Sequence, residues 1–91
     1  MNHDPLQKLS FPLQKAFLKL TTPKQIFNFL RDLLTPDEIA EFSLRLDIAS
    51  RLDKWQNYKK IEEQTWASST TIARVAKFLN GSFGGYKSVL K

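Results

Sequence analysis

The sequence predicts an all-helical fold, and three of its features lead to that class. Apolar residues recur at steps of three and four, which is the spacing of one face of a helix. Strand-like alternation is scarce, and only 3 of the 91 residues are glycine. Hydrophobic residues make up 42% of the chain, so its composition is not that of a disordered protein. We expect a single domain, residues 1–91, that is marginally stable as a lone monomer because a chain this short buries a modest fraction of its surface.

Residues 6–20 form the first predicted helical region. Pro12 lies inside it and predicts a kink or a break, because proline lacks the amide proton that a helix interior uses. The apolar residues on one face of this region are Leu6, Leu9, Leu13, Phe17 and Leu20.

A second helix is predicted to start after Thr22. Thr22 can cap it, Pro23 suits the first helical position, and Gln25 completes a capping box. The helix contains IFNFLRDLL, in which six of nine residues are apolar. A helix that is apolar on several faces is buried on several sides. In so short a chain, we expect a second subunit to cover it.

A long helix is predicted from Thr35 to about Asp53. Thr35 can cap it, and Asp37 and Glu38 lie in the first turn, where the helix dipole favours negative charge. The expected apolar face consists of Ile39, Phe42, Leu46, Ala49 and Leu52.

Residues 57–80 have the size of a helix-turn-helix, with two short helices joined by about three residues. Asn57 is a good N-cap for the first helix and Ser68 for the second. Asn80 and Gly81 predict the end of the second helix. The expected inward residues are Tyr58, Ile61, Thr65, Ile72, Val75, Ala76 and Leu79.

All of the net positive charge, which is +5, lies in residues 54–91. Residues 1–53 hold seven basic and seven acidic side chains, whereas residues 54–91 hold seven basic side chains against Glu62 and Glu63. A localised basic face is typical of a polyanion binder. A solvated basic surface has the same composition, so charge alone leaves both interpretations open.

The hydroxyl residues that open the second helix are the first candidates for a DNA contact. In a helix-turn-helix, the first helix crosses the DNA backbone and the second enters the major groove by its N-terminal end. Short hydroxyl side chains there allow close approach and can bond to phosphates or base edges. The candidate DNA-binding residues are Lys59, Lys60, Ser68, Ser69, Thr70, Thr71, Arg74 and Lys77.

Three segments of the chain, in this order, resemble the Trp repressor superfamily and, more closely, its YerC/YecD group of small bacterial regulators. They are FLRDLLTPDEIAEFSLRLDIASRL, YKKIEEQTWASSTTIARVAKFLN and GGY. The likeness runs from about Leu13 to Val89. It implies an all-helical, intertwined homodimer with two helix-turn-helix units that controls transcription, and we expect a repressor. On that pattern, residues 6–53 form the dimerisation core, residues 57–80 the helix-turn-helix and residues 81–91 a C-terminal tail.

Two tryptophans depart from the family's pattern. Trp66 replaces the glycine of the turn, and Trp55 falls where relatives often carry glycine. A residue other than glycine in the left-handed region costs roughly 1–2 kcal/mol. The turn is therefore either strained or wider and shifted. We expect both indoles to bury against the long helix and offset that cost; the alternative is a functional aromatic that contacts a partner or stacks near DNA.

The resemblance also bears on a small-molecule effector. In the tryptophan-sensing members, a pocket lies between the long helix and the second helix of the helix-turn-helix, which reads the DNA. Arg45 and Arg74 match two of the residue types that line this pocket. These two are the candidate effector-binding residues. Val75 and Phe78 fall where those members carry small residues, so we expect no binding of free tryptophan, and the effector remains unknown. Arg45 has a second, structural interpretation, as a salt-bridge partner of Asp37, Glu41 or Asp47.

Several classes of function find no support in the sequence. Cysteine is absent, which excludes a disulfide, a thiolate nucleophile and a zinc finger. The single histidine, His3, lies near a terminus and is expected to be solvated. No metal cluster, nucleophile with a base or paired-carboxylate pocket emerges, so we expect neither an enzyme nor a bound metal or cofactor. No signal peptide or apolar run of about 18 residues is present, so we expect no membrane contact and a cytoplasmic, nucleoid-associated protein.

Two functions remain. The leading prediction is a sequence-specific regulator that binds double-stranded DNA as a homodimer. The alternative is a non-catalytic interaction module in which Trp55, Trp66 and Phe83 dock a protein partner. Binding to such a partner would persist in salt that strips DNA from the protein.

Overall fold

The computed structural model describes residues 4–90, and in that range it contains seven helices and no strand. The predicted all-helical class is confirmed. The chain forms two compact units, Met1–Pro36 and Asp37–Lys91, which are described in turn. His3 lies outside the described residues, so its expected solvation stays a prediction.

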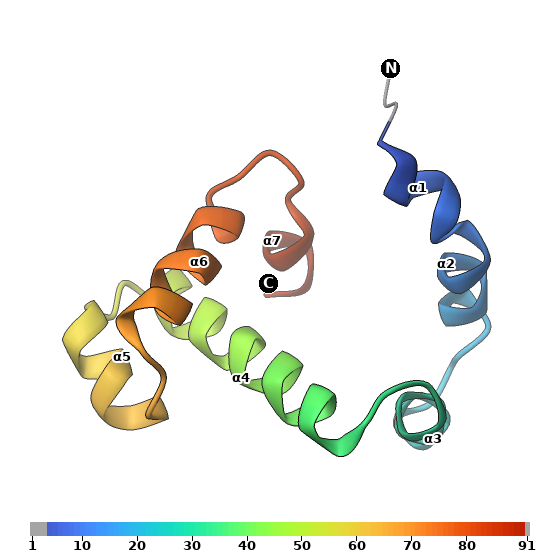
Figure 1. Ribbon diagram of the computed structural model, residues 1–91, viewed down its shortest axis with the longest axis horizontal. Helices are drawn as coiled ribbons and strands as arrows, with labels where there is room; N and C mark the ends of the chain where they lie inside the picture. Colours follow the sequence, from blue (N-terminus) through green and yellow to red (C-terminus); the bar gives the residue numbers. More distant parts are fainter. Residues whose placement is uncertain (1–3, 91) are drawn as a thin grey trace. The chain divides into compact units, whose positions relative to one another are not determined.

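The first unit contains α1 (Pro5–Leu9), α2 (Phe11–Leu18) and α3 (Pro23–Leu33) (Figure 1). The break predicted near Pro12 is confirmed, because Ser10 ends α1 and begins α2. Pro12 thus lies in the first turn of α2, where a missing amide proton leaves no helical hydrogen bond unmade.

The start of α3 is capped as predicted, with one difference. The Oγ1 of Thr22 accepts a hydrogen bond from the backbone N–H of Gln25 at 3.1 Å. The Oε1 of Gln25 reaches past Thr22 and accepts from the backbone N–H of Thr21 at 2.8 Å. The reciprocal hydrogen bond of the capping box is therefore made to Thr21, the residue before the N-cap.

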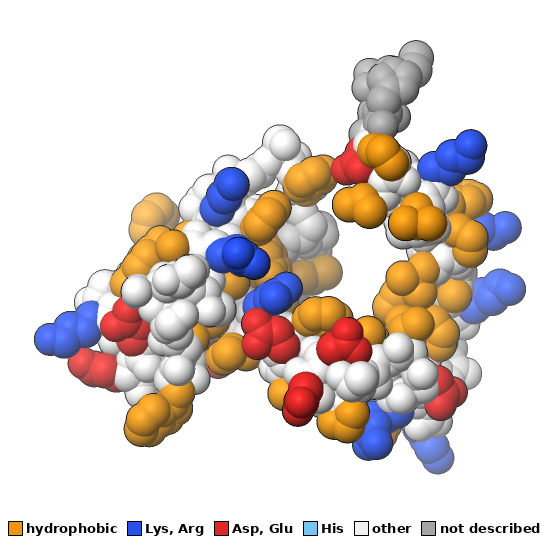
Figure 2. All heavy atoms as spheres, viewed as in Figure 1, with side chains coloured by type: hydrophobic (Ala, Val, Ile, Leu, Met, Phe, Trp, Pro, Cys, Tyr) orange, Lys and Arg blue, Asp and Glu red, His pale blue; other side chains and the backbone are white. Residues whose placement is uncertain are grey.

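Among the described residues, no side chain of α1, α2 or α3 is buried. Phe17 and Phe29 make an edge-to-face ring contact at 5.4 Å, but large apolar side chains stay exposed along all three helices, as the orange side chains in Figure 2 show. The exposed residues are Leu6, Leu9, Phe11, Leu13, Phe17, Leu18, Ile26, Phe27 and Leu33. These helices have an apolar face without a core of their own.

The second unit is built on α4 (Pro36–Asp53), which ends at the predicted residue. Around the C-terminal half of α4 lie α5 (Tyr58–Thr65), α6 (Ser69–Leu79) and α7 (Gly85–Val89) (Figure 1). The buried core consists of Ile48, Ala49, Ile61, Ala67, Ile72, Val75 and Leu79. None of the helices in residues 4–90 combines the length and the apolarity that crossing a membrane requires.

The predicted apolar face of α4 is partly wrong. Phe42 and Leu46 are 46% and 44% exposed, whereas Ile48, outside the predicted face, is fully buried. Leu44 and Leu52 lie one turn to either side of Ile48 and pack against the core. The helix carries two apolar stripes, and α5 to α7 cover only one of them.

Two further expectations are corrected. Tyr58, expected to point inward, is 43% exposed because it is the first residue of α5 and lies at the edge of the packed region. The C-terminal tail contains a helix, α7, preceded by Gly84 in the left-handed conformation (φ 71°). Tyr86 and Leu90 pack against the core, so this segment is part of the second unit's fold.

Candidate nucleic-acid interface

The helix-turn-helix consists of α5, the residues Trp66 to Ser68, and α6. Both helices begin at their predicted caps. The Oδ1 of Asn57 accepts from the backbone N–H of Lys60 at 2.8 Å, and the Oγ of Ser68 accepts from the backbone N–H of Thr71 at 3.2 Å. These bonds set the entry of each helix by contacts within three residues.

The two faces of α6 differ in character. Ile72, Val75 and Leu79 are buried in the core and hold the helix on the second unit. Thr70, Arg74 and Lys77 follow at steps of four and three on the opposite face, and all three are exposed. Packing on one side therefore presents a fixed polar face on the other.

The four hydroxyl residues at the start of α6 divide into two pairs. Ser68 and Thr71 bond to each other twice. The hydroxyl of Ser68 accepts the cap bond from the Thr71 N–H, and the two side-chain oxygens share a hydrogen bond at 3.1 Å. The side chains of Ser69 and Thr70 are exposed and make no hydrogen bond within residues 4–90. The second pair is free to bond outside the chain.

Within residues 4–90, the cations of the helix-turn-helix have no acidic partner, in contrast to several cations elsewhere in the second unit. Arg45 pairs with Glu41 at 3.3 Å, Arg51 with Asp47 at 3.2 Å, and Lys87 with Asp53 at 3.4 Å. Within the described part of the chain, no acid pairs with the exposed cations Lys59, Lys60, Arg74 and Lys77.

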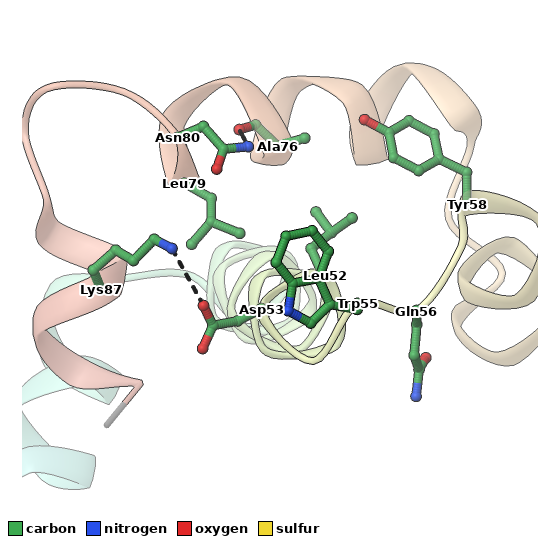
Figure 3. A pocket seen from close by; sticks show the side chains of 9 residues that line it. All are labelled: Leu52, Asp53, Trp55, Gln56, Tyr58, Ala76, Leu79, Asn80 and Lys87. Atoms are coloured by element: carbon green, nitrogen blue, oxygen red, sulfur yellow. Dashed lines mark hydrogen bonds and ion pairs between the residues drawn. The ribbon is translucent and has the colours of Figure 1, made fainter.

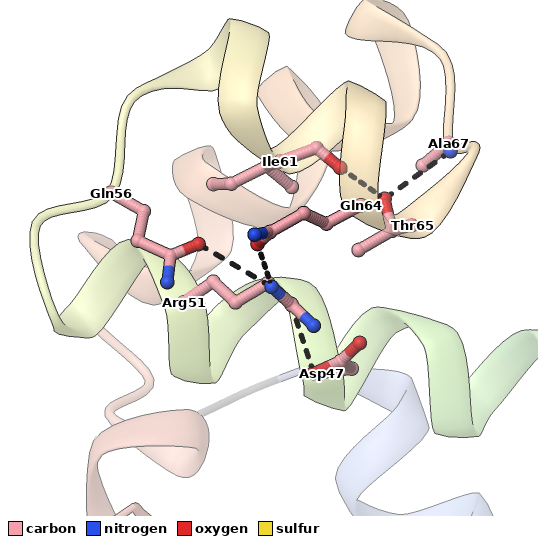
Figure 4. Close-up of polar contacts among 7 residues, drawn as sticks. All are labelled: Asp47, Arg51, Gln56, Ile61, Gln64, Thr65 and Ala67. Carbon is pink, nitrogen blue, oxygen red and sulfur yellow. Dashed lines mark hydrogen bonds and ion pairs between the residues drawn. The ribbon is translucent and has the colours of Figure 1, made fainter.

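A polar network that the sequence reasoning missed braces α5 against α4 (Figure 4). The guanidinium of Arg51 donates to Asp47 at 3.2 Å, to Gln56 at 3.5 Å and to Gln64 through a short hydrogen bond. The spacing of Asp47 and Arg51 is visible in the sequence as a helical pair. The bond to Gln64, 13 residues further on, requires the turn between the helices.

The turn between α5 and α6 is held by backbone and hydroxyl bonds. Trp66 adopts the left-handed conformation (φ 63°, ψ 11°), and its N–H donates to the carbonyl of Glu62 at 2.9 Å. The hydroxyl of Thr65 donates to the carbonyl of Ile61 at 2.7 Å and accepts from the N–H of Ala67 at 3.2 Å. The turn keeps three residues and the left-handed residue that glycine usually supplies.

Trp55 occupies a similar corner between α4 and α5. Its φ is 66°, its N–H donates to Leu52 at 3.0 Å, and the N–H of Gln56 donates to Arg51 at 3.1 Å. This pair of bonds is the helix ending that normally has glycine in the left-handed position. Of the two alternatives that the sequence left open, the strained left-handed residue is the one present, at Trp66 and at Trp55 alike.

The expectation that both indoles bury is wrong. Trp55 is 93% exposed and Trp66 is 92% exposed. At the second corner, the small side chain of Ala67 fills the core next to the exposed indole. Neither ring gains burial that would offset the strain of its backbone.

The effector candidates Arg45 and Arg74 differ in their surroundings. Arg45 pairs with Glu41, one of the three acids that the sequence offered it, and its guanidinium lies 5.7 Å from the centre of the Phe42 ring. Arg74 is exposed and unpaired within residues 4–90. Val75 belongs to the core and is 2% exposed, whereas Phe78 is 48% exposed.

A pocket of about 250 Å³ lies where α4, α5, α6 and α7 meet (Figure 3). Neither Arg45 nor Arg74 contributes to it. Its lining consists of Leu52, Asp53, Trp55, Gln56, Tyr58, Ala76, Leu79, Asn80 and Lys87. The ion pair between Lys87 and Asp53 already satisfies the charges of this pocket. Across residues 4–90, no three His, Cys, Asp or Glu side chains come together in a way that could hold a metal ion.

The resemblance found in the sequence is confirmed by comparison with known proteins. The profile of the Trp repressor protein family matches residues 8–91. A curated relative, the uncharacterized protein YerC of Bacillus subtilis (strain 168), is 36% identical over 78 residues, which are 86% of this chain and 75% of YerC. No solved structure matches the chain at a comparable level of significance. The chain therefore belongs to the Trp repressor family, and within it to the YerC-like group.

Proposed function

We propose that the protein is a sequence-specific DNA-binding transcriptional regulator, a repressor, that acts as a homodimer through its helix-turn-helix. In this proposal, α6 enters the major groove by its N-terminal end and α5 crosses the backbone. Membership of the Trp repressor family supports it. A regulator of this kind is not an enzyme, and its partner is double-stranded DNA.

The observation that carries the proposal is the state of the polar groups on α5 and α6. Their four cations have no acidic partner within residues 4–90, and the hydroxyls of Ser69 and Thr70 are free there. Cations at an interface with DNA must be available to phosphates, whose neutralisation supplies salt-dependent affinity. Ser69, Thr70 and Arg74 would supply discrimination between bases. Ser68 and Thr71 would shape the end of the helix that approaches the groove.

The homodimer is supported by the first unit. Its helices bury no side chain within residues 4–90, although large apolar residues lie along all three of them. Exposed apolar surface on this scale marks an interface. A second copy of the chain that covers this surface would make residues 6–53 a dimerisation core and leave the two helix-turn-helix units outside it.

We expect the regulator not to respond to free tryptophan. Val75 already fills core space, and the large ring of Phe78 stands one turn further along the same helix. Calorimetric titration with the free amino acid checks this, and no saturable heat is expected. Saturable binding that is lost in Arg45→Ala would contradict the expectation and assign Arg45 to an effector site.

The experiment that tests the proposed function is selection of bound duplexes from a random library by the purified, ligand-free protein. Dimeric helix-turn-helix proteins, the Trp repressor among them, read half-sites about 34 Å apart. We expect enrichment of a near-palindrome with half-sites one helical turn apart. Salt-sensitive retention of DNA without enrichment would contradict sequence-specific reading. Failure to retain any duplex at low salt would contradict DNA binding altogether.

A further inference from the structure

We propose that Trp66 contacts the sugar-phosphate backbone of the DNA half-site that α6 reads. This inference rests on the proposed function and adds a contact residue to it. The contact is made by a neutral side chain from the turn, beside the hydroxyls and cations of the two helices.

The first argument is that the tryptophan costs stability in the free chain and gains nothing visible there. Trp66 has a φ of 63°, where glycine is unstrained, yet its indole is 92% exposed. Strain of this kind persists at sites where it serves function. Trp55 shares both properties, so strain and exposure alone do not identify the partner.

The second argument is position. Trp66 lies two residues before Ser68, the N-cap of α6, at the end of the reading helix that approaches the duplex. Trp55 lies at the other end of α5, before its first turn. A large side chain that stands free at the turn between α5 and α6 lies next to the proposed interface.

The third argument is chemistry. Between Lys60 and Arg74 the chain has no basic residue, so phosphate contacts from this stretch must come from neutral donors. The indole N–H is a donor only, which suits a phosphate oxygen, and the ring can cover the apolar face of the adjacent deoxyribose. Tryptophan is also among the residues that carry most energy at interfaces.

A neutral contact makes a distinctive prediction about salt. Each phosphate neutralised by lysine or arginine releases counterions and steepens the dependence of affinity on salt. Loss of an indole contact should therefore lower affinity without changing that slope. Because the contact is to the backbone, affinity should fall to the same extent on selected and unrelated duplexes.

The test uses Trp66→Gly and Trp66→Asn, because both residues accept the left-handed conformation and so keep the turn. We expect about tenfold weaker binding (~1.4 kcal/mol) to a selected duplex and to an unrelated one, with an unchanged salt slope. We expect no fall in melting temperature. The matched control is Trp55→Gly, which removes an equally exposed and equally strained indole and should leave DNA affinity within about twofold of the parent.

Fluorescence gives a second readout that a structural role would not move. The chain has two tryptophans, so Trp55→Phe leaves Trp66 as the only indole. Its emission should change in intensity and wavelength as the selected duplex is added. Trp66→Phe, which keeps only Trp55, should show no such change.

Three results would overturn the inference. Parent-like DNA affinity in both Trp66 variants would show that Trp66 does not contact DNA, and the proposed function would be unaffected. Equal losses in Trp55→Gly and Trp66→Gly, or losses that follow a lower melting temperature in both Trp66 variants, would assign the effect to the fold. If the parent protein retains no duplex at low salt, the proposed function fails and the inference falls with it.

Discussion

Arg74 is the single side chain on which the reading of a DNA sequence would depend most. It is exposed on α6 and has no partner within residues 4–90, whereas Arg45 and Arg51 on α4 are both paired. A guanidinium forms two parallel hydrogen bonds to the acceptors of guanine, which makes arginine the commonest source of base discrimination. Its freedom in the chain is consistent with that role.

We predict that Arg74→Ala weakens binding to a selected duplex by about 1–3 kcal/mol and barely affects an unrelated duplex. The reason is that a contact to a base edge is made only on the correct sequence. Competition binding on both duplexes measures the difference. Lys59→Ala is the matched control: we expect it to weaken both complexes and to reduce the salt slope by about one. Equal losses on both duplexes in Arg74→Ala would make Arg74 a phosphate contact.

The two tryptophans are the other feature at this scale. Each occupies a left-handed position at a cost of roughly 1–2 kcal/mol, and each exposes its ring. For a chain with a core of this size, such a cost is a large part of the stability that single domains have. The left-handed conformation of Trp55 and Trp66 therefore costs folding free energy that glycine at the same positions would not cost.

At the scale of the element, the turn between α5 and α6 depends on one hydroxyl. Thr65 joins the last turn of α5 to the residue after Trp66, since it donates to Ile61 and accepts from Ala67. Ala67 belongs to the buried core, and the hydrogen bond of its N–H is partly buried.

We predict that Thr65→Val destabilises the protein by about 1–3 kcal/mol, because it keeps the shape of the side chain and leaves the N–H of Ala67 without its acceptor. Denaturant unfolding measures the change. Thr65→Ser, which retains the hydroxyl, is the control and should remain within about 0.5 kcal/mol of the parent. Equal stability of the valine and serine variants would show that the hydroxyl does not hold the turn.

The long helix α4 shows how one element serves two surfaces. Its C-terminal half contributes Ile48 and Ala49 to the buried core. Arg51, in the same half, donates a hydrogen bond to Gln64 of α5. Its other stripe leaves Phe42 and Leu46 exposed. A helix with two apolar stripes is suited to pack within its own chain and against a second copy at once.

At the scale of the whole molecule, stability should depend on association. Within residues 4–90, every buried apolar side chain lies in the second unit, and the helices of the first unit bury none. A homodimer couples folding to protein concentration, because the folded dimer is favoured by mass action.

We predict a particle of about twice 10.5 kDa and a melting temperature that rises with protein concentration. Phe27→Asp should raise the dimer dissociation constant at least about tenfold, because it places a charge on the exposed apolar face of α3. Asn28→Asp adds the same charge at a polar position of the same helix and serves as the control. Sedimentation equilibrium measures both. A parent protein that stays monomeric at all concentrations would contradict the dimer.

The parts of this protein that could be predicted from sequence are those that local contacts control. Thr22, Asn57 and Ser68 cap helices through hydrogen bonds to residues three positions away in the sequence. The location of the positive charge in residues 54–91 needs no fold at all. The positions of the two helices and of their exposed polar residues could therefore be predicted from the sequence.

Only the tertiary structure decided which surfaces are covered, because burial depends on residues far apart in the chain. It buried Ile48 in place of Phe42, and it brought Gln64 to Arg51 across 13 residues. It also added α7 to the second unit. Both indoles are exposed to solvent, and next to Trp66 it is Ala67 that packs into the core. No local sequence pattern distinguishes a tryptophan that packs from one that is exposed.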